Sequence, residues 1–122
     1  MISRKAGDRF AREWEASWNS HDIDRIIGHY AEDVVLVSPI AGELLGDPEV
    51  RGIEPVRQYF TKGLQAYPDL RFEVLDVLCG VDSIVLHYVN QNGTRASEFM
   101  QLDPEGKVVR MVAHYSDTER GV

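Results

Sequence analysis

The Asn92-Gly93 pair is the feature that most constrains the fold of this chain, because it stands between two β-rich runs. Residues 84–102 read IVLHYVNQNGTRASEFMQL. An Asn-Gly pair in this setting is the strongest short-range signal for a β-hairpin with a two-residue loop. Counting outward from that loop places His87 opposite Glu98, and opposed residues point to the same face of a sheet. The sequence therefore predicts an imidazole and a carboxylate side by side.

A second turn, at residues 103–106, predicts a third strand that pairs with the second arm of this hairpin. A four-residue loop there sets Met100 against Val109 and Glu98 against Met111. One face of the three strands then carries Val85, His87, Val89, Ala96, Glu98, Met100, Leu102, Val109, Met111, Ala113 and Tyr115. This face is apolar apart from His87 and Glu98, so the alternation predicts that it faces the core. Ionisable side chains are rarely buried in a core unless they are paired or functional.

The composition indicates one globular domain over residues 1–122. The hydrophobic fraction of 43% and the charged fraction of 27% are ordinary for a folded chain. The net charge of -7 and the lack of a Lys/Arg run disfavour a nucleic-acid partner. No apolar run approaches the ~20 residues of a membrane span, and the N-terminus lacks the apolar segment of a secretory signal. A single cysteine, Cys79, cannot form an internal disulfide, which favours a cytoplasmic location.

Hydrophobic periodicity predicts three helices in the first part of the chain. Phe10, Trp14 and Trp18 form one stripe of the first helix, and Asp22 suits the N-cap of a short second helix. The expected elements are helices over 4–19, 23–30 and 55–67 and strands over 33–39, 69–79 and, in three segments, 84–115. The last four strands are expected to form a meander.

This order predicts an α+β fold with the helices on a single face of one antiparallel sheet. A strongly curved sheet wrapped around three helices makes a cone, whose interior the aromatic side chains would line or plug. Residues 40–51 are expected to form a Gly/Pro-punctuated loop, either a flap over something apolar or a packed connection.

Three stretches of the chain resemble the nuclear transport factor 2 superfamily, in its SnoaL-like and ketosteroid-isomerase-like branch. They read WNSHDIDRIIGHYAEDVVLVSP, RGIEPVRQYFTKGL and GKVVRMVAHYSD. The resemblance implies the same cone-shaped fold, a deep apolar pocket and a homodimer packed through the outer sheet face. On the expected registers that outer face carries Tyr88, Phe99, Val108 and Val112, a composition that suits a protein interface.

The resemblance can be carried over residue by residue to the isomerase positions. Ser38 stands where ketosteroid isomerases have their catalytic base, and Trp14 stands where they have a tyrosine. Glu98 falls on the position of the protonated pocket acid. Only one of the three positions keeps its acid, so steroid isomerisation by that constellation is not expected, because Ser38 cannot remove a proton without an activating base.

His87 and Glu98 are the candidate catalytic pair. A coupled imidazole and carboxyl in a pocket offer the proton donor and acceptor that enolisation, cyclisation or dehydration of a carbonyl compound needs. The alternative is a satisfied polar contact inside a core. The candidate substrate-binding residues, which packing alone could also explain, are Trp14, Trp18, Ser38, Tyr59, Met111 and Tyr115. The sequence has neither metal-ligand spacing nor a phosphate-binding glycine loop, so no metal or cofactor is expected.

Two functions fit these expectations. The first is a SnoaL-like enzyme that performs cofactor-free proton transfer, of the isomerase, cyclase or dehydratase type, on a small apolar carbonyl compound. The second is a non-catalytic hydrophobic-ligand-binding or dimerisation module of the same fold. A cavity of several hundred cubic ångströms, the usual size of a ligand site, would favour binding. An interior filled by Trp14, Trp18 and Phe60 would favour a structural role.

Overall fold

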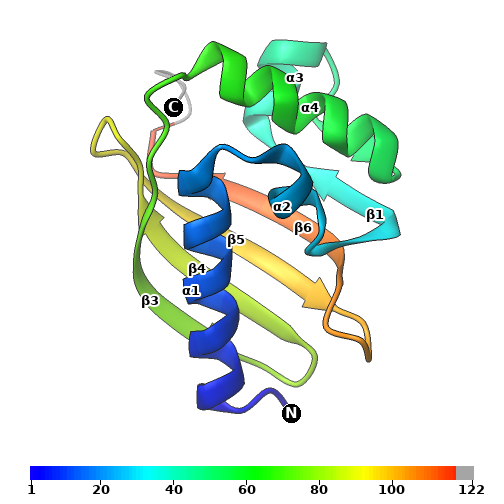
Figure 1. The fold of residues 1–122 in the computed structure, drawn as a ribbon, viewed down its shortest axis with the longest axis vertical. Coiled ribbons are helices and arrows are strands. Elements are labelled where there is room, and N and C mark those ends of the chain that lie inside the picture. The colour runs from blue at the N-terminus through cyan, green and yellow to red at the C-terminus, as the bar shows by residue number, and fades with distance from the viewer. Residues whose placement is uncertain (118–122) are drawn as a thin grey trace.

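The computed structural model describes residues 1–117 and contains four helices and a six-stranded curved sheet that does not close into a barrel (Figure 1). The helices are α1 (Arg4–Ser20), α2 (Ile23–Ile27), α3 (Pro39–Leu45) and α4 (Ile53–Ala66). The strands are β1 (Tyr30–Val37), β2 (Glu49–Arg51), β3 (Glu73–Cys79), β4 (Ser83–Val89), β5 (Arg95–Leu102) and β6 (Val108–Tyr115). The predicted α+β class is confirmed.

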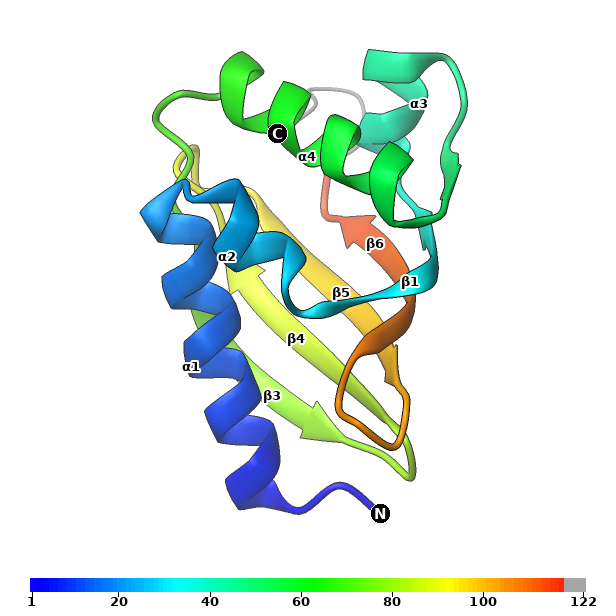
Figure 2. The same cartoon turned by 45° about the vertical axis from the view of Figure 1, so that its right-hand side comes forward.

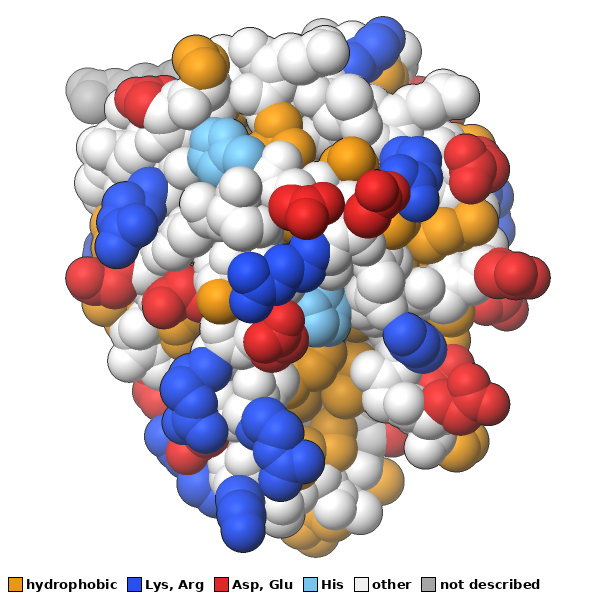
Figure 3. Space-filling view, viewed as in Figure 1, with side chains coloured by type: hydrophobic (Ala, Val, Ile, Leu, Met, Phe, Trp, Pro, Cys, Tyr) orange, Lys and Arg blue, Asp and Glu red, His pale blue; other side chains and the backbone are white. Residues whose placement is uncertain are grey.

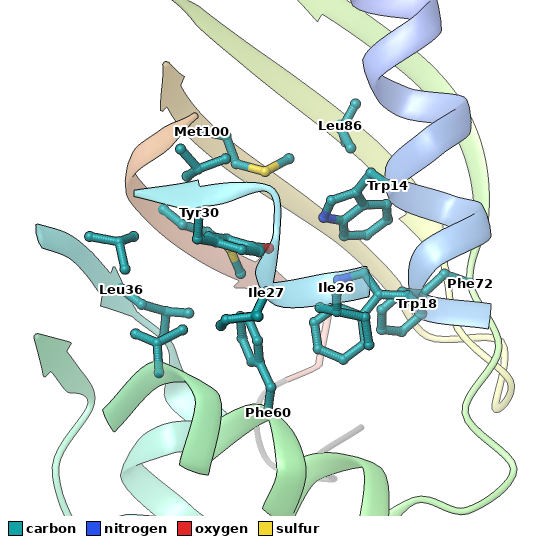
Figure 4. Packing of buried hydrophobic residues seen from close by; sticks show 14 of the residues in the cluster. Trp14, Trp18, Ile26, Ile27, Tyr30, Leu36, Phe60, Phe72, Leu86 and Met100 are labelled. Carbon is teal, nitrogen blue, oxygen red and sulfur yellow. The ribbon is translucent and has the colours of Figure 1, made fainter. Parts of the chain in front are cut away.

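The strand order is β2-β1-β6-β5-β4-β3, so the predicted meander of the last four strands is confirmed. One pairing differs from the expected all-antiparallel sheet, because β1 lies parallel to β6. Figure 2 shows α1 across the sheet beside β3, and α4 near the other end beside β1. The space between these helices and the sheet holds the core, where Figure 4 shows large apolar side chains from both layers in contact.

The three predicted helices are present, but the second ends at Ile27, and Tyr30, which was expected in that helix, begins β1. Ser3 caps α1 by accepting a hydrogen bond from the backbone N–H of Ala6, and Asp22 caps α2 as expected. Trp14 and Trp18 are buried on the core-facing stripe of α1. None of the helices among residues 1–117 is long and apolar enough to cross a membrane.

The segment 40–51 contains regular structure that the sequence did not predict. Ser38 caps α3, since its hydroxyl accepts a hydrogen bond from the backbone N–H of Ile40 at 3.2 Å. Ile40 is buried, and β2 pairs with β1 through its buried Val50. Of the two alternatives considered for this segment, the structure shows the packed connection.

The predicted register of the β4–β5 hairpin is wrong by one residue. Tyr88 pairs with Ala96, His87 with Ser97 and Leu86 with Glu98. Three residues, at positions 91–93, form the loop, and Gly93 has a φ of 79°. This is the arrangement of a turn followed by a left-handed residue. The buried Asn90 side chain stabilises it, because its Oδ1 accepts hydrogen bonds from the backbone N–H groups of residues 92 and 94.

A one-residue change of register turns every side chain of β4 to the other face. His87 therefore lies on the outer face of the sheet, while Tyr88 lies on the inner face and is 1% exposed. The predicted contact between His87 and Glu98 is wrong. The inward positions of Ala96, Glu98 and Met100 on β5 are confirmed.

The second turn also differs from its predicted register. Glu98 pairs with Ala113 instead of Met111, and Met111 pairs with Met100. Because the pairing is irregular between Gln101 and Leu102, the inward position at the start of β6 belongs to Val108 rather than Val109. Met111 still faces the core, since the two registers differ by an even number of residues.

Charged side chains of both signs are interspersed over the face shown in Figure 3. Two exposed ion pairs between helices are Arg25 with Glu13, at 3.2 Å, and Arg57 with Asp24, at 2.7 Å. Solvent screens exposed pairs of this kind, so they contribute little to stability. The position of the helices is therefore set mainly by burial of their apolar stripes.

Candidate functional site

A small cavity lies between the inner face of the sheet, α1 and α4. It has a volume of about 60 Å³. Its lining residues are Trp14, Trp18, Ser38, Ile40, Tyr59, Phe60, Gly63, Tyr67, Leu70, Phe72, Tyr88, Glu98, Met111 and Tyr115. At roughly 10–15 Å³ for each water, this space holds a handful of water molecules. The interior is thus far more filled than a site of several hundred cubic ångströms.

Among the described residues that line the cavity, Glu98 is the one acidic side chain. It is 3% exposed, because β5 alternates and its neighbours on the same face, Ala96 and Met100, are also buried. Its Oε1 accepts a 2.7 Å hydrogen bond from the Tyr88 hydroxyl. Its Oε2 is buried without a hydrogen-bond partner among the described residues. One carboxyl oxygen is therefore held in place, and the other is free to meet a ligand.

Burial raises the pKa of Glu98 to about 7, although the hydrogen bond from Tyr88 acts in the opposite direction. Near neutral pH the carboxyl group therefore exists in both protonation states. A carboxyl group in this condition can accept or donate a proton with little cost in either direction.

Hydroxyl groups gather beside Glu98. The hydroxyls of Ser38 and Tyr59 are 3.2 Å apart. Tyr115 lines the same part of the cavity, and the neighbouring Ser38 and Tyr88 act to lower its pKa against the larger effect of burial. Burial raises the pKa of Tyr59, Tyr88 and Tyr115, and the charge of Glu98 adds to each increase, so all three phenols stay protonated at neutral pH. Tyr59 and Tyr115 can donate hydrogen bonds to an oxygen atom in the cavity, whereas Tyr88 already donates its proton to Glu98.

The opposite wall is aromatic. The ring of Trp14 stacks on Phe72 at 5.4 Å and lies 5.0 Å from Tyr88. Trp18 meets Phe60 edge-on at 4.8 Å. Figure 4 shows these rings converging from α1, α4 and the segment before β3. Such rings fix one another in position, so they give the cavity a rigid apolar wall.

The indole N–H groups of Trp14 and Trp18 are buried without a hydrogen-bond partner among residues 1–117. Both lie close enough to the Tyr30 hydroxyl to favour its ionised form, although burial dominates and raises the pKa of Tyr30. The Tyr30 hydroxyl itself points to the Met111 sulfur at 3.5 Å. These polar atoms lie behind the apolar wall.

Seven of the eight predicted site residues line this cavity: Trp14, Trp18, Ser38, Tyr59, Glu98, Met111 and Tyr115. Their roles toward a ligand remain predictions. The eighth, His87, lies in a shallow hollow on the outer face with Ser97 and His114, on the other side of the sheet from Glu98. The partner of Glu98 is Tyr88, which the sequence analysis placed on the outer face. No group of His, Cys, Asp and Glu within the described part of the chain is arranged to hold a metal ion.

The position of Tyr88 follows from a signal that is present in the sequence. The inner set of β4 is Ile84, Leu86 and Tyr88, and the outer set contains His87. The set of Ile84, Leu86 and Tyr88 is the more apolar of the two. Apolarity alone therefore predicts that Tyr88 faces the core. The apolarity of the two sets and the Asn-Gly loop rule therefore predict opposite faces for Tyr88, and the structure agrees with apolarity.

The raised pKa of Glu98 predicts a pH-dependent stability. Its usual value is 4.5, so between pH 4.5 and pH 7 the folded protein binds more protons than the unfolded chain. The free energy of unfolding should therefore fall as pH rises through this interval, by about 3 kcal/mol from this group, with the loss complete above pH 7. Urea denaturation of the wild type and of Glu98→Gln at pH 4.5 to 8 isolates the contribution of Glu98 to the free energy of unfolding, because the other ionisable groups contribute equally to both proteins. Parallel curves for the two proteins would contradict the prediction.

Comparison with known proteins gives a family match and several similar structures. The family model described as the SnoaL-like domain matches residues 11–117. A SnoaL-like protein of unknown function from Burkholderia thailandensis is 37% identical, with 95% of this chain and 98% of that chain covered and a TM-score of 0.91. No protein of curated function matches the chain.

Two more distant structures share the fold. One is the epoxide hydrolase/cyclase-like enzyme SalBIII, with a role in pyran ring formation in the polyether salinomycin: 21% identity, 98% and 97% of the two chains covered, TM-score 0.75. The other is a protein of unknown function from Burkholderia pseudomallei, related to nuclear transport factor 2: 17% identity, 93% and 92% covered, TM-score 0.74. At these identities the likeness shows the fold alone.

Proposed function

Because the chain belongs to the SnoaL-like domain family, we propose that it is a cofactor-free enzyme that moves a proton on a small apolar carbonyl compound. The single observation that carries the proposal is Glu98, a buried carboxyl with a pKa of about 7 and one free oxygen in the cavity wall. The reaction type is an isomerisation, cyclisation or dehydration. SalBIII, an epoxide hydrolase/cyclase-like enzyme with a role in pyran ring formation, has this fold and supports the cyclisation alternative.

The proposed step begins with the ionised form of Glu98. Its carboxylate removes a proton from the carbon next to the carbonyl, and the electrons of that C–H bond form the C=C bond of an enolate. The hydroxyls of Tyr115 and Ser38 donate hydrogen bonds to the enolate oxygen, where negative charge develops. The C=O π electrons move onto the oxygen; in an unsaturated ketone the enolate is a dienolate, and when the carbonyl forms again the neutral Glu98 returns the proton to the far carbon while the C=C bond shifts, so atoms and charge balance. Tyr88 orients the carboxyl group through the bond to Oε1.

The lining supports an uncharged substrate. The cavity wall contains no Lys, Arg or His among the described residues, so a carboxylate or phosphate would find no opposite charge. The aromatic wall favours a flat apolar skeleton. The small volume favours a single ring or a short chain over a polycyclic compound.

The test is exchange of carbon-bound protons for deuterium in small ketones, followed by NMR in D2O. Cyclopentanone and cyclohex-2-enone with the wild-type protein should exchange faster than in buffer alone, and the rate should rise with pH to a plateau above about pH 7. Exchange at the buffer rate across a panel of such ketones would remove support for an enzyme.

A non-catalytic ligand-binding or dimerisation module is the second candidate. The observation that favours it is the size of the cavity, about 60 Å³, which leaves the interior mostly filled. A ketone that raises the Tm without exchanging its protons would favour this candidate over the enzyme.

We also propose that the chain forms a homodimer through the outer face of its sheet. The pairings place Leu78, Val85, Phe99 and Val112 in one apolar row across β3, β4, β5 and β6. Leu78 is 57% exposed, and a large exposed apolar row on a sheet favours a protein partner. Tyr88 and Val108, which the sequence analysis included in this face, are buried on the inner side and do not contribute.

The dimer is tested by sedimentation velocity. The wild type should sediment with about twice the chain mass of 13.8 kDa, and Leu78→Glu should shift it to the monomer because a carboxylate would be buried in the interface. Lys62→Glu, at an exposed position of α4, is the matched control and should stay dimeric. A wild type that remains monomeric at high concentration would rule out the interface.

A further inference from the structure

Gly63 is an anomaly on the core-facing side of α4. Glycine in a helix interior weakens the helix relative to alanine. The buried residues of this helix are Val56, Tyr59 and Phe60, and Gly63 follows them at spacings of seven, four and three. These spacings put Gly63 on the same stripe. A residue on that stripe normally packs a side chain against the sheet.

Close packing does not explain the glycine. A Cβ atom added at Gly63 would have no atom of the surrounding described elements within 4 Å. By contrast, a Cβ at Gly7 on α1 would collide with the Cys79 sulfur, so close packing does account for that glycine. The backbone of Gly63 is helical, so a left-handed conformation is not the reason either. The space opposite Gly63 is the cavity itself.

The exposure of the lining residues locates the mouth of the cavity. Most of them are buried, Glu98 and both tryptophans included. The three that are half-exposed are Gly63, Tyr67 and Tyr115. These three residues are therefore the part of the lining that meets solvent.

We infer that Gly63 forms the entrance of the cavity and sets the size of the molecules that reach Glu98. The missing side chain leaves an opening on α4 that any larger residue would narrow. The inference rests on the proposed function, because access to Glu98 matters only if the cavity takes a ligand. In this inference Gly63 controls the access of a ligand to Glu98 and takes no part in proton transfer.

Acrylamide quenching of tryptophan fluorescence tests the entrance without knowledge of the substrate. The chain has two tryptophans, and both line the cavity and are almost fully buried. Acrylamide is a small, uncharged amide that reaches them through the mouth. The wild type should be quenched, and Gly63→Leu should reduce the quenching constant by at least about threefold, because the leucine fills the opening.

Matched variants separate this effect from a general change in α4. Gln65→Leu adds the same side chain at an exposed position of α4 and should leave quenching unchanged. Gly63→Ala should raise the Tm by about 3 °C, because the added methyl meets no atom and favours the helix. A lower Tm for Gly63→Ala would show that the space is not open. Tryptophans in the wild type that acrylamide does not quench, or equal quenching constants for wild type and Gly63→Leu, would each overturn the inference.

A second readout keeps this test distinct from the test of the proposed function. The pKa of Glu98, followed by the ¹³C shift of its carboxyl, should stay near 7 in Gly63→Leu, because the variant changes access and not the contact with Tyr88. Reduced quenching together with an absence of ketone exchange in the wild type would support the entrance and refute the enzyme.

Discussion

Glu98→Gln should lower the rate of carbon-bound proton exchange by about 10²–10⁴-fold, the usual contribution of a positioned acid or base. Glutamine keeps the size of the side chain and its amide oxygen can still accept the hydrogen bond from Tyr88, but an amide cannot act as a proton-accepting base at neutral pH. The loss should therefore appear in the turnover rate and leave ketone binding, measured by the shift in Tm, within a few-fold of the wild type. NMR in D2O at pH 7.5 measures both proteins under the same conditions.

The matched control for this variant is Glu105→Gln. Glu105 is an exposed acid in the turn between β5 and β6 and does not line the cavity. Glu105→Gln removes the same carboxylate charge as Glu98→Gln. It should exchange ketone protons at the wild-type rate. Retained exchange in Glu98→Gln would show that another group carries the proton. The exchange rate of Tyr88→Phe should lie between those of Glu98→Gln and Glu105→Gln. This variant loses the hydrogen bond that orients the carboxyl group of Glu98 but keeps the carboxyl group itself.

The helical part of the fold could be predicted because local signals agree there with the tertiary structure. In α1, the spacing of Trp14 and Trp18 identified the buried stripe, and both side chains are in the core. The capping role of Asp22 likewise depends only on near neighbours. Such signals are contained within a few residues of sequence.

The register of the hairpin could not be read from the Asn-Gly pair alone. The loop gains a residue because the buried Asn90 side chain bonds to the backbone at residues 92 and 94, which is a local alternative to a two-residue turn. One added residue reversed β4 and left β5 as expected. For this reason Glu98 was placed correctly while its partner was not.

The volume of the interior could not be predicted from the sequence either. Composition shows that aromatic residues share the core-facing stripes, but their mutual angles decide whether they leave a cavity. The stack of Trp14 on Phe72 and the edge contact of Trp18 with Phe60 fill most of the cone. The sequence could not predict the opening at Gly63, because it depends on there being no atom within 4 Å of the position of a Cβ.

Trp14→Ala should reduce the free energy of unfolding by about 3–5 kcal/mol, the usual cost of truncating a buried aromatic residue. Trp14 is 1% exposed and contacts both Phe72 and Tyr88, so its removal leaves a void between α1 and the sheet. Urea denaturation followed by far-UV circular dichroism measures the loss. Phe10→Ala, on the same stripe but half-buried, is the control and should cost less than half as much. Equal losses for the two would show that Trp14 is not the centre of the core.

The same variant should also change the site, because Trp14 is part of the wall that keeps water from Glu98. Burial is the main cause of the raised pKa of that carboxyl group. Water that enters the void should therefore lower the pKa of Glu98 from about 7 toward its usual 4.5, as the charged form becomes better solvated. Titration of the carboxyl ¹³C shift in Trp14→Ala, at a urea-free condition where the protein stays folded, measures this shift. A pKa that stays near 7 would mean that Tyr88 and the rest of the wall exclude water without Trp14, and the stability loss would then be independent of the chemistry at Glu98.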